Sequence, residues 1–151
     1  MIRIFRTDAK HPDFKMLVAK LDADLAQRDG DEHSFYDQFN KIALIKYALV
    51  AYEEGVPIAC GAIKQLEPNV MEVKRMYVTP EKRGMGFATM VLSELEDWAR
   101  ELGQKTCVLE TGKRQPEAIA LYTKNGYTVI PNYGQYAGIE NSVCFEKHLL
   151  G

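Results

Sequence analysis

The chain has 151 residues with a net charge of −2, and 46% of the residues are hydrophobic. This composition is typical of a globular domain large enough to bury a core without disulfides or metal ions. The near-neutral charge gives no reason to expect binding to nucleic acid or to an anionic membrane. The N-terminus lacks the apolar run of a signal peptide, and no run approaches the roughly 18 residues of a membrane span. We therefore expect a cytoplasmic protein.

The cysteines predict neither a disulfide framework nor a metal site. Cys60, Cys107 and Cys144 each lie inside a run typical of a strand. Their odd number and the absence of a Cys-x-x-Cys motif favour three reduced, partly buried thiols. Since no His/Cys cluster has the spacing of zinc ligands, we expect no metal.

The first half of the chain predicts four strands and two helices. Residues 2–6 alternate apolar and polar side chains, as a strand does. Apolar residues with helical spacing predict a helix over about residues 13–28, and a short helix is expected at 34–39. Further strands are expected at 47–52, 58–66 and 70–78, with Glu53-Glu54-Gly55 and Pro68-Asn69 as the turns between them.

The second half predicts a long helix at 88–102, a strand at 106–110, a short helix from Pro116 to Gly126, and strands at 127–130 and 142–147. Several charged residues lie off the apolar stripe of the long helix, so we expect them to face solvent: Glu94, Glu96, Asp97, Arg100 and Glu101. The fold class is then α/β (α+β), a single domain over residues 1–151 with a mixed sheet and flanking helices.

The segment Arg83-Gly84-Met85-Gly86-Phe87-Ala88 joins a predicted strand to the long helix. The N–H groups at the start of a helix have no partner inside it, and glycine lets an anion come close to them. The helix dipole adds a partial positive charge, and Arg83 adds a full one. Together these features predict a phosphate site.

Two other nucleotide-binding motifs do not fit this turn. A Walker loop requires Gly, four residues and then Gly-Lys-Ser/Thr, which the chain does not contain. A Rossmann fingerprint requires Gly or Ala where Thr89 stands. A glycine turn that only starts a helix is the remaining structural alternative.

The glycine turn and the residues before it resemble the acyl-CoA signature of the GNAT acetyltransferase superfamily. In that signature Arg or Gln is followed by two residues, Gly, one residue, and Gly or Ala, and Arg83, Gly86 and Ala88 fill these positions. Residues 118–127 are similar to the family's second hallmark, a helix ending in Tyr-x-x-x-Gly-Phe/Tyr. One position departs from the family pattern, because Gln115 stands where Asn is common.

The resemblance implies the GNAT fold, with a mixed, mostly antiparallel central sheet, and acetyl-CoA as co-substrate without a metal. The acetyl group would pass directly to a primary amine, with no covalent enzyme intermediate. The pyrophosphate of CoA would bind the turn, and the pantetheine arm would pair with the strand before it. The implied cofactor-binding residues are Met76, Tyr77, Val78, Arg83, Gly84, Met85, Gly86, Phe87, Ala88, Thr89 and Gln115.

The chemistry of transfer requires three groups. The amine must lose a proton before it attacks, the thioester oxygen needs a hydrogen-bond donor, and the departing thiolate leaves more easily when protonated. By resemblance, Glu72 is the candidate base, the Met76 N–H the candidate donor and Tyr122 the candidate general acid. The structural alternatives are a solvated Glu72 paired with a nearby Lys or Arg, and a Tyr122 that packs against the sheet with its hydroxyl hydrogen-bonded. Glu110 is a second candidate base.

Two further expectations concern the face of a strand on which side chains lie and the burial of Tyr127. Strand alternation places Glu72, Lys74 and Met76 on one face of their strand and Val73, Arg75 and Tyr77 on the other. Tyr127 matches a family position usually filled by aromatic packing, so we expect it in the core.

The expected acceptor is a small amine, such as an amino acid, a polyamine or an aminoglycoside-like molecule, because the chain has no extra recognition domain. The alternatives are a peptide or protein N-terminus as acceptor, and a non-catalytic acyl-CoA-binding sensor or interaction module as function. Residues 132–141 form either one wall of the acceptor pocket, with Glu140 attracting an ammonium group, or an ordinary loop. Dimers are common in the family, so the resemblance suggests a homodimer.

Overall fold

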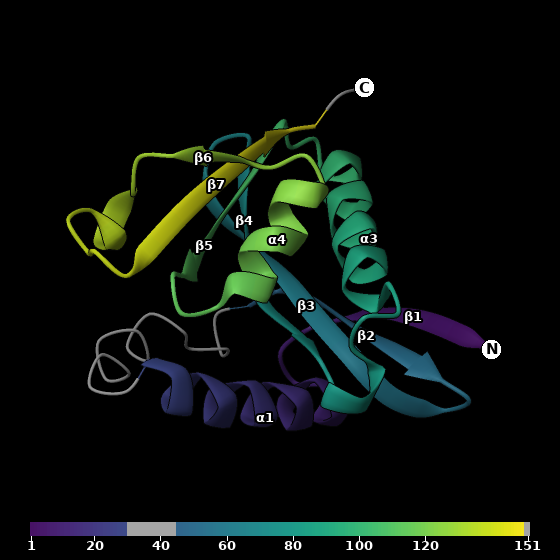
Figure 1. The fold of residues 1–151 in the computed structure, drawn as a ribbon. Helices are drawn as coiled ribbons and strands as arrows, with labels where there is room; N and C mark the ends of the chain where they lie inside the picture. Colours follow the sequence, from purple (N-terminus) through teal and green to yellow (C-terminus); the bar gives the residue numbers. More distant parts are fainter. Residues whose placement is uncertain (30–44, 150–151) are drawn as a thin grey trace.

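The computed structural model describes residues 1–29 and 45–149. Its strands form one sheet in the order β1-β2-β3-β4-β5-β7-β6 (Figure 1). They are β1 (Ile2–Thr7), β2 (Tyr47–Glu53), β3 (Val56–Glu67), β4 (Val70–Val78), β5 (Thr106–Gly112), β6 (Thr128–Ile130) and β7 (Ser142–His148). Neighbouring strands are antiparallel except β4 and β5, which are parallel. The mixed, mostly antiparallel sheet expected from the sequence is confirmed.

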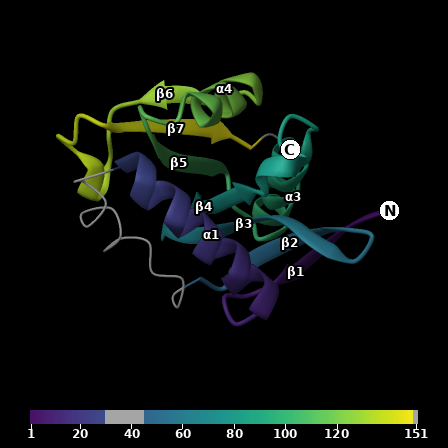
Figure 2. The same ribbon diagram turned by 60° about the horizontal axis from the view of Figure 1, so that its bottom comes forward.

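The helices are α1 (Pro12–Asp29), α3 (Phe87–Glu101) and α4 (Pro116–Lys124), with 3₁₀ turns η3 (Pro80–Lys82) and η4 (Gly134–Tyr136). Figure 2 shows α1 lying across one face of the sheet, and the core clusters place α3 and α4 on the other. Among the described helices, none combines the length and the apolar composition that a membrane crossing requires. The helix predicted at 34–39 lies outside the described residues.

Both faces of the sheet are covered, because alternate residues of its strands pack against different helices. In β2, Leu49 and Ala51 belong to the core under α3, whereas Ala48 and Val50 belong to the core under α1. All four side chains are fully buried. Each fully buried Leu or Val contributes about 1.5–3 kcal/mol, so packing on both sides fixes the register of the sheet.

β4 and β5 pair only at the start of both strands. Residues 70–72 of β4 pair with residues 106–108 of β5, and no later residues of these two strands pair. β4 continues to Val78 along β3 alone. The two strands therefore separate, and the edge of β4 that faces β5 is left without a ladder partner.

β4 also contains a β-bulge. Between the pairs Cys60↔Tyr77 and Ala62↔Lys74, β4 has one residue more than β3. Arg75 lies there with a φ of 58°, in the left-handed region that non-glycine residues seldom adopt.

The bulge makes the alternation predicted for β4 wrong beyond Lys74. Met76 packs against the core under α3, the same core that holds Val73. Tyr77 belongs to the core under α1, and Arg75 forms an ion pair with that helix. One inserted residue moves every later side chain to the opposite face, because the side-chain period of a strand is two.

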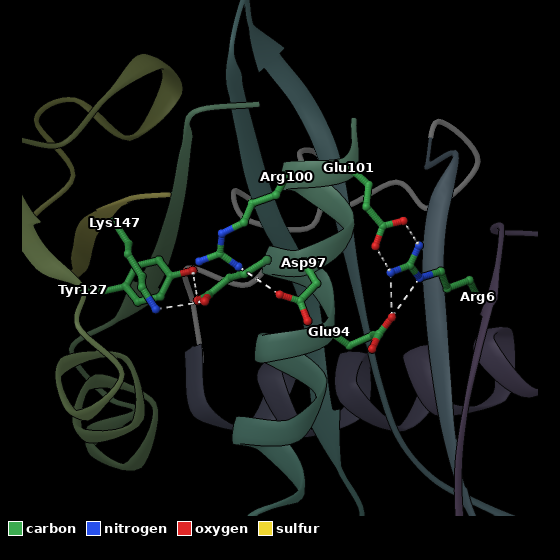
Figure 3. A network of polar contacts seen from close by, with 8 residues as sticks. Arg6, Glu94, Asp97, Arg100, Glu101, Tyr127 and Lys147 are labelled. Carbon is green, nitrogen blue, oxygen red and sulfur yellow. Dashed lines mark hydrogen bonds and ion pairs between the residues drawn. The ribbon is translucent and has the colours of Figure 1, made fainter. Parts of the chain in front are cut away.

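Glu96 on α3 is only 5% exposed, so the solvated position predicted for it is wrong. Its carboxylate accepts hydrogen bonds from the Tyr127 hydroxyl at 2.9 Å and from the Lys147 ammonium group at 2.9 Å. Figure 3 shows these two side chains meeting at the helix. Glu101 on the same helix is exposed, as predicted, and pairs with Arg6. Burial of Glu96 is tolerated because its charge is paired and both oxygens are hydrogen-bonded.

Replacing Glu96 with alanine should lower the free energy of unfolding by about 2–4 kcal/mol, because Tyr127 and Lys147 lose their shared partner. Urea unfolding followed by circular dichroism measures this loss. The matched control is Asp97→Ala, since the Asp97 side chain is 58% exposed and pairs with Arg100 at the surface. We expect the control to change stability by less than about 0.5 kcal/mol. Equal, small losses in both variants would contradict a buried network.

Candidate active site

A cavity of about 530 Å³ opens where β4 and β5 separate. It is lined by β4, the end of β5, the turn before α3, and parts of α1 and α4. Glu72 and Tyr122 line it, as do ten predicted cofactor-binding residues: Met76, Tyr77, Val78, Arg83, Gly84, Gly86, Phe87, Ala88, Thr89 and Gln115. Met85 does not line the cavity, and its side chain is exposed to solvent.

The glycine turn opens α3 directly against the cavity. Gly86 is the N-cap of α3 with a φ of 87°, a conformation that glycine adopts without strain. Its carbonyl accepts the first helical hydrogen bond, from the Met90 N–H at 3.0 Å. The N–H groups of Phe87, Ala88 and Thr89 cannot bond within the helix, and all three residues line the cavity. This geometry suits an anion.

Arg83 supplies a positive charge beside this turn. Its Nε donates a hydrogen bond to the Val78 carbonyl at 2.9 Å, and its guanidinium lies 5.4 Å from the centre of the Tyr77 ring. Its Nη2 is 3.8 Å from the Asp24 carboxylate of α1. The guanidinium is therefore held at the end of β4, where the chain leaves the sheet.

Tyr122 on α4 is buried and lines the cavity. Its ring centroid lies 5.8 Å from that of Tyr127, which is buried in the core as predicted, and 6.1 Å from that of Phe145. Burial, and secondarily the Glu110 carboxylate, raises the pKa of Tyr122 above its ordinary value. The hydroxyl therefore stays protonated at neutral pH, so it can donate a proton but does not serve as a base.

Glu72 lies in the cavity wall and is only 4% exposed, so the alternative of a solvated glutamate is wrong. One oxygen, Oε2, accepts a hydrogen bond from the Tyr133 hydroxyl at 2.6 Å. The other, Oε1, lies 3.7 Å from the ammonium nitrogen of Lys74. Burial lowers the pKa of Lys74, although the neighbouring Glu72 carboxylate opposes that effect.

Glu110, the second candidate base, lines the same cavity from β5. Its Oε2 accepts a hydrogen bond from the Ser142 hydroxyl at 2.8 Å. Residues 132–141 contribute to the cavity wall through Tyr136. Glu140, in contrast, is exposed and does not line the cavity.

Sequence reasoning missed several residues of the cavity. Lys74 carried a usable signal, since it follows Glu72 by two residues on one strand and shares its face. Tyr133 does not line the cavity itself but contacts Glu72 in its wall, and it carried no signal because this contact joins distant segments. Leu21 and Leu25 of α1 also line the cavity, and their helical spacing predicted burial but not this location.

The cysteines lie in the interior of the fold. All three cysteines are free and buried, and burial raises the pKa of Cys60 and of Cys107 to about 12. Such thiols are unreactive. Within residues 1–29 and 45–149, no group of three or more His, Cys, Asp or Glu side chains is placed to hold a metal ion.

Comparison with known proteins assigns this arrangement of separating strands and glycine turn to a family. The model of the Acetyltransferase (GNAT) family matches residues 14–127. The chain therefore belongs to the GNAT family of acetyltransferases and is an acyltransferase.

Relatives agree with this assignment. The IAA acetyltransferase of Azospirillum brasilense is 40% identical over 102 residues, which cover 67% of each protein. A Klebsiella pneumoniae protein assigned to the acyl-CoA N-acyltransferases is 34% identical, with a TM-score of 0.82 over 99% of both chains. A GNAT acetyltransferase from Elizabethkingia anophelis, solved with acetyl-CoA bound, has a TM-score of 0.72 at 17% identity over 98% of both chains. That last likeness shows the fold alone.

Proposed function

We propose that this chain is an N-acetyltransferase that moves the acetyl group of acetyl-CoA directly to a primary amine of a small molecule. One observation carries the proposal: the glycine turn, the open edge of β4, Tyr122 and Glu72 all line a single cavity. A donor and an acceptor bound there would meet between the proposed acid and the proposed base. The relative named as an IAA acetyltransferase supports acetyl as the transferred group.

Acetyl-CoA binds with its pyrophosphate on the first turn of α3, where the helix dipole and Arg83 compensate its charge. Its pantetheine arm pairs with β4 from Met76 to Val78. The Thr79 N–H donates to the Ile58 carbonyl on the β3 side at 2.9 Å. Backbone groups alternate sides along a strand, so those of Val78 point into the cavity, where Arg83 reaches the Val78 carbonyl.

Transfer then uses three groups of the cavity. Glu72 takes a proton from the ammonium group of the acceptor, directly or through a water, and the free amine attacks the thioester carbon. The Met76 N–H donates to the oxygen that becomes negative in the tetrahedral intermediate. The nitrogen releases its second proton to water as the C–S bond breaks, Tyr122 gives its proton to the departing thiolate, and the tyrosinate then takes up a proton from water.

A screen of amines tests this function. Purified protein is incubated with acetyl-CoA and single amines, among them amino acids, polyamines, aminoglycosides and peptides, while released CoA thiol is measured. We expect one class of small amine to release thiol and to gain one acetyl group by mass spectrometry. Release with peptides alone would favour a peptide or protein N-acetyltransferase. Tight binding of acetyl-CoA without release across the panel would favour a non-catalytic sensor.

The proposal includes further points carried by the sequence. Residues 1–151 form one acetyltransferase domain, located in the cytoplasm and acting without nucleic acid or membrane. The net charge of −2 supports the last point. A homodimer is the proposed assembly, and light scattering of the purified protein measures it.

A further inference from the structure

The β6–β7 connection (residues 131–141) and the first residue of β7 each contact one carboxylate of the cavity. The Tyr133 hydroxyl donates to Glu72 of β4 at 2.6 Å. The Ser142 hydroxyl, where β7 begins, donates to Glu110 of β5 at 2.8 Å. Each of the two separating strands thus presents one carboxylate that accepts a hydroxyl hydrogen bond from this part of the chain.

The connection is held in place by its own contacts. The Asn132 side-chain amide donates to the Ile139 carbonyl at 3.0 Å and to the Ser142 carbonyl at 3.1 Å, which closes the segment. The Tyr133 and Tyr136 rings pack edge to face with centroids 5.7 Å apart. Tyr136 is only 3% exposed. The Tyr133 hydroxyl therefore reaches Glu72 from a preorganised segment rather than from a loosely held loop.

The two carboxylates differ in their surroundings. Glu72 is buried, whereas Glu110 is half-buried. The titratable and charged groups around Glu72 are Lys64, Lys74, Glu110, Tyr133, Tyr136 and Cys144. Burial, and next the Glu72 carboxylate, raises the pKa of Tyr133. Tyr133 therefore stays a donor over the working pH range, and its hydrogen bond fixes the orientation of the Glu72 carboxylate.

We propose that Tyr133 is a positioning residue that holds the Glu72 carboxylate aimed into the cavity, and that Glu72 rather than Glu110 takes the proton of the acceptor amine. The inference rests on the proposed function. The proton moves from the ammonium nitrogen to a Glu72 oxygen, and Tyr133 keeps its own proton. Glu110 then contributes negative charge near the acceptor without exchanging a proton.

The test compares the pH–rate profiles of Tyr133→Phe and the wild type. Phenylalanine keeps the ring contact with Tyr136 but removes the hydrogen bond to Glu72. We expect kcat to fall about tenfold, less than the roughly 100-fold or more that loss of a general base costs, because Glu72 itself remains. The acidic limb of the kcat/KM profile should move to higher pH, because the ionised carboxylate has lost a hydrogen bond. The dissociation constant for acetyl-CoA should stay within about twofold of the wild-type value, since a base contributes nothing to binding the donor.

The matched control is Ser142→Ala, which removes the equivalent hydroxyl from Glu110. Its acidic limb should coincide with that of the wild type. A shift in Ser142→Ala and none in Tyr133→Phe would overturn the inference and make Glu110 the base. An unchanged profile in both variants would also overturn it.

If Tyr133→Phe is less stable than the wild type, a double-mutant cycle with Glu72→Gln still tests whether Tyr133 acts through Glu72. In a Glu72→Gln background, removing the Tyr133 hydroxyl should have no further effect on kcat, because the group that it positions is gone. Additive losses would overturn the inference. A wild type that acetylates no amine would overturn the proposed function itself, whereas an active wild type with additive losses would overturn only the role of Tyr133.

Discussion

Replacing Tyr122 with phenylalanine should lower kcat for acetyl transfer about 100-fold, at the lower end of general-acid effects that extend to about 10⁴-fold. The departing thiol has an ordinary pKa of about 8.5, so at neutral pH its thiolate leaves faster when a proton is supplied. Because burial raises the pKa of Tyr122, the wild-type hydroxyl carries that proton across the neutral range. Steady-state thiol release with the best amine of the screen measures the loss.

Two measurements separate this chemical effect from a structural one. The dissociation constant of Tyr122→Phe for acetyl-CoA, measured by calorimetry, should stay within about twofold of the wild-type value, because the lost proton transfer acts only on the transition state. Tyr127→Phe is the matched control, since its ring neighbours Tyr122 but does not line the cavity. Tyr127→Phe should lower the free energy of unfolding, because the hydrogen bond to Glu96 is lost. Its kcat should stay within about threefold of the wild-type value. Wild-type turnover in Tyr122→Phe would contradict its role as the acid.

Replacing Gly86 with aspartate should weaken acetyl-CoA binding at least about 100-fold, or about 2.7 kcal/mol. The new carboxylate would stand at the first turn of α3, where the pyrophosphate is proposed to bind, and like charges in contact cost several kcal/mol. A Cβ at Gly86 meets no atom within 4 Å, so aspartate causes no clash there, and the strain of a side chain at a φ of 87° recurs in the Gly103 control at a φ of 79°. Isothermal titration with acetyl-CoA measures the change.

The controls for Gly86→Asp isolate charge and position. Gly86→Asn has nearly the same shape without the charge, and it should lose clearly less affinity. Gly103 follows the other end of α3, with a φ of 79° and the same open space around a Cβ. Since Asp and Asn tolerate this left-handed conformation, Gly103→Asp should fold and bind acetyl-CoA like the wild type. Equal affinity losses at Gly86 and Gly103 would place the phosphate elsewhere.

Features set by neighbouring residues were predictable from the sequence. The hairpin predicted at Glu53-Glu54-Gly55 is confirmed, with Glu54 at a φ of 50° and Gly55 at 79°. The loop has two residues, as tight hairpins often do, and Gly55 adopts its positive φ without strain, so the turn signal is local. The long helix was predicted from about residue 88 and begins at Phe87. Its apolar period and the glycine before it are also local features, so the sequence was sufficient to predict it.

Features set by distant residues were not predictable. The bulge at Arg75 depends on how β4 pairs with β3, and it turned Met76 to the other face. The burial of Glu96 depends on Lys147, which is 51 residues away in the chain. In both cases the local pattern was read correctly, and tertiary pairing overrode it.

The candidate site also has one part set by neighbouring residues and one part set by distant residues. The glycine turn is a local motif, and the structure brings nearly all of its predicted residues to the cavity. The other end of the cavity is assembled from β4, β5 and the β6–β7 connection, which are far apart in the chain. The contact of Tyr133 with Glu72 spans 61 residues, so this contact became visible only in the fold.

A crystal structure of the wild type with acetyl-CoA tests the central claim most directly. Our account predicts the pyrophosphate within hydrogen-bond distance, about 3.5 Å or less, of the N–H groups of Phe87 to Thr89. It also predicts the pantetheine arm along Met76 to Val78 and the thioester sulfur within hydrogen-bond reach of the Tyr122 hydroxyl. Acetyl-CoA bound outside the cavity between β4 and β5, or with its sulfur turned away from Tyr122, would contradict it.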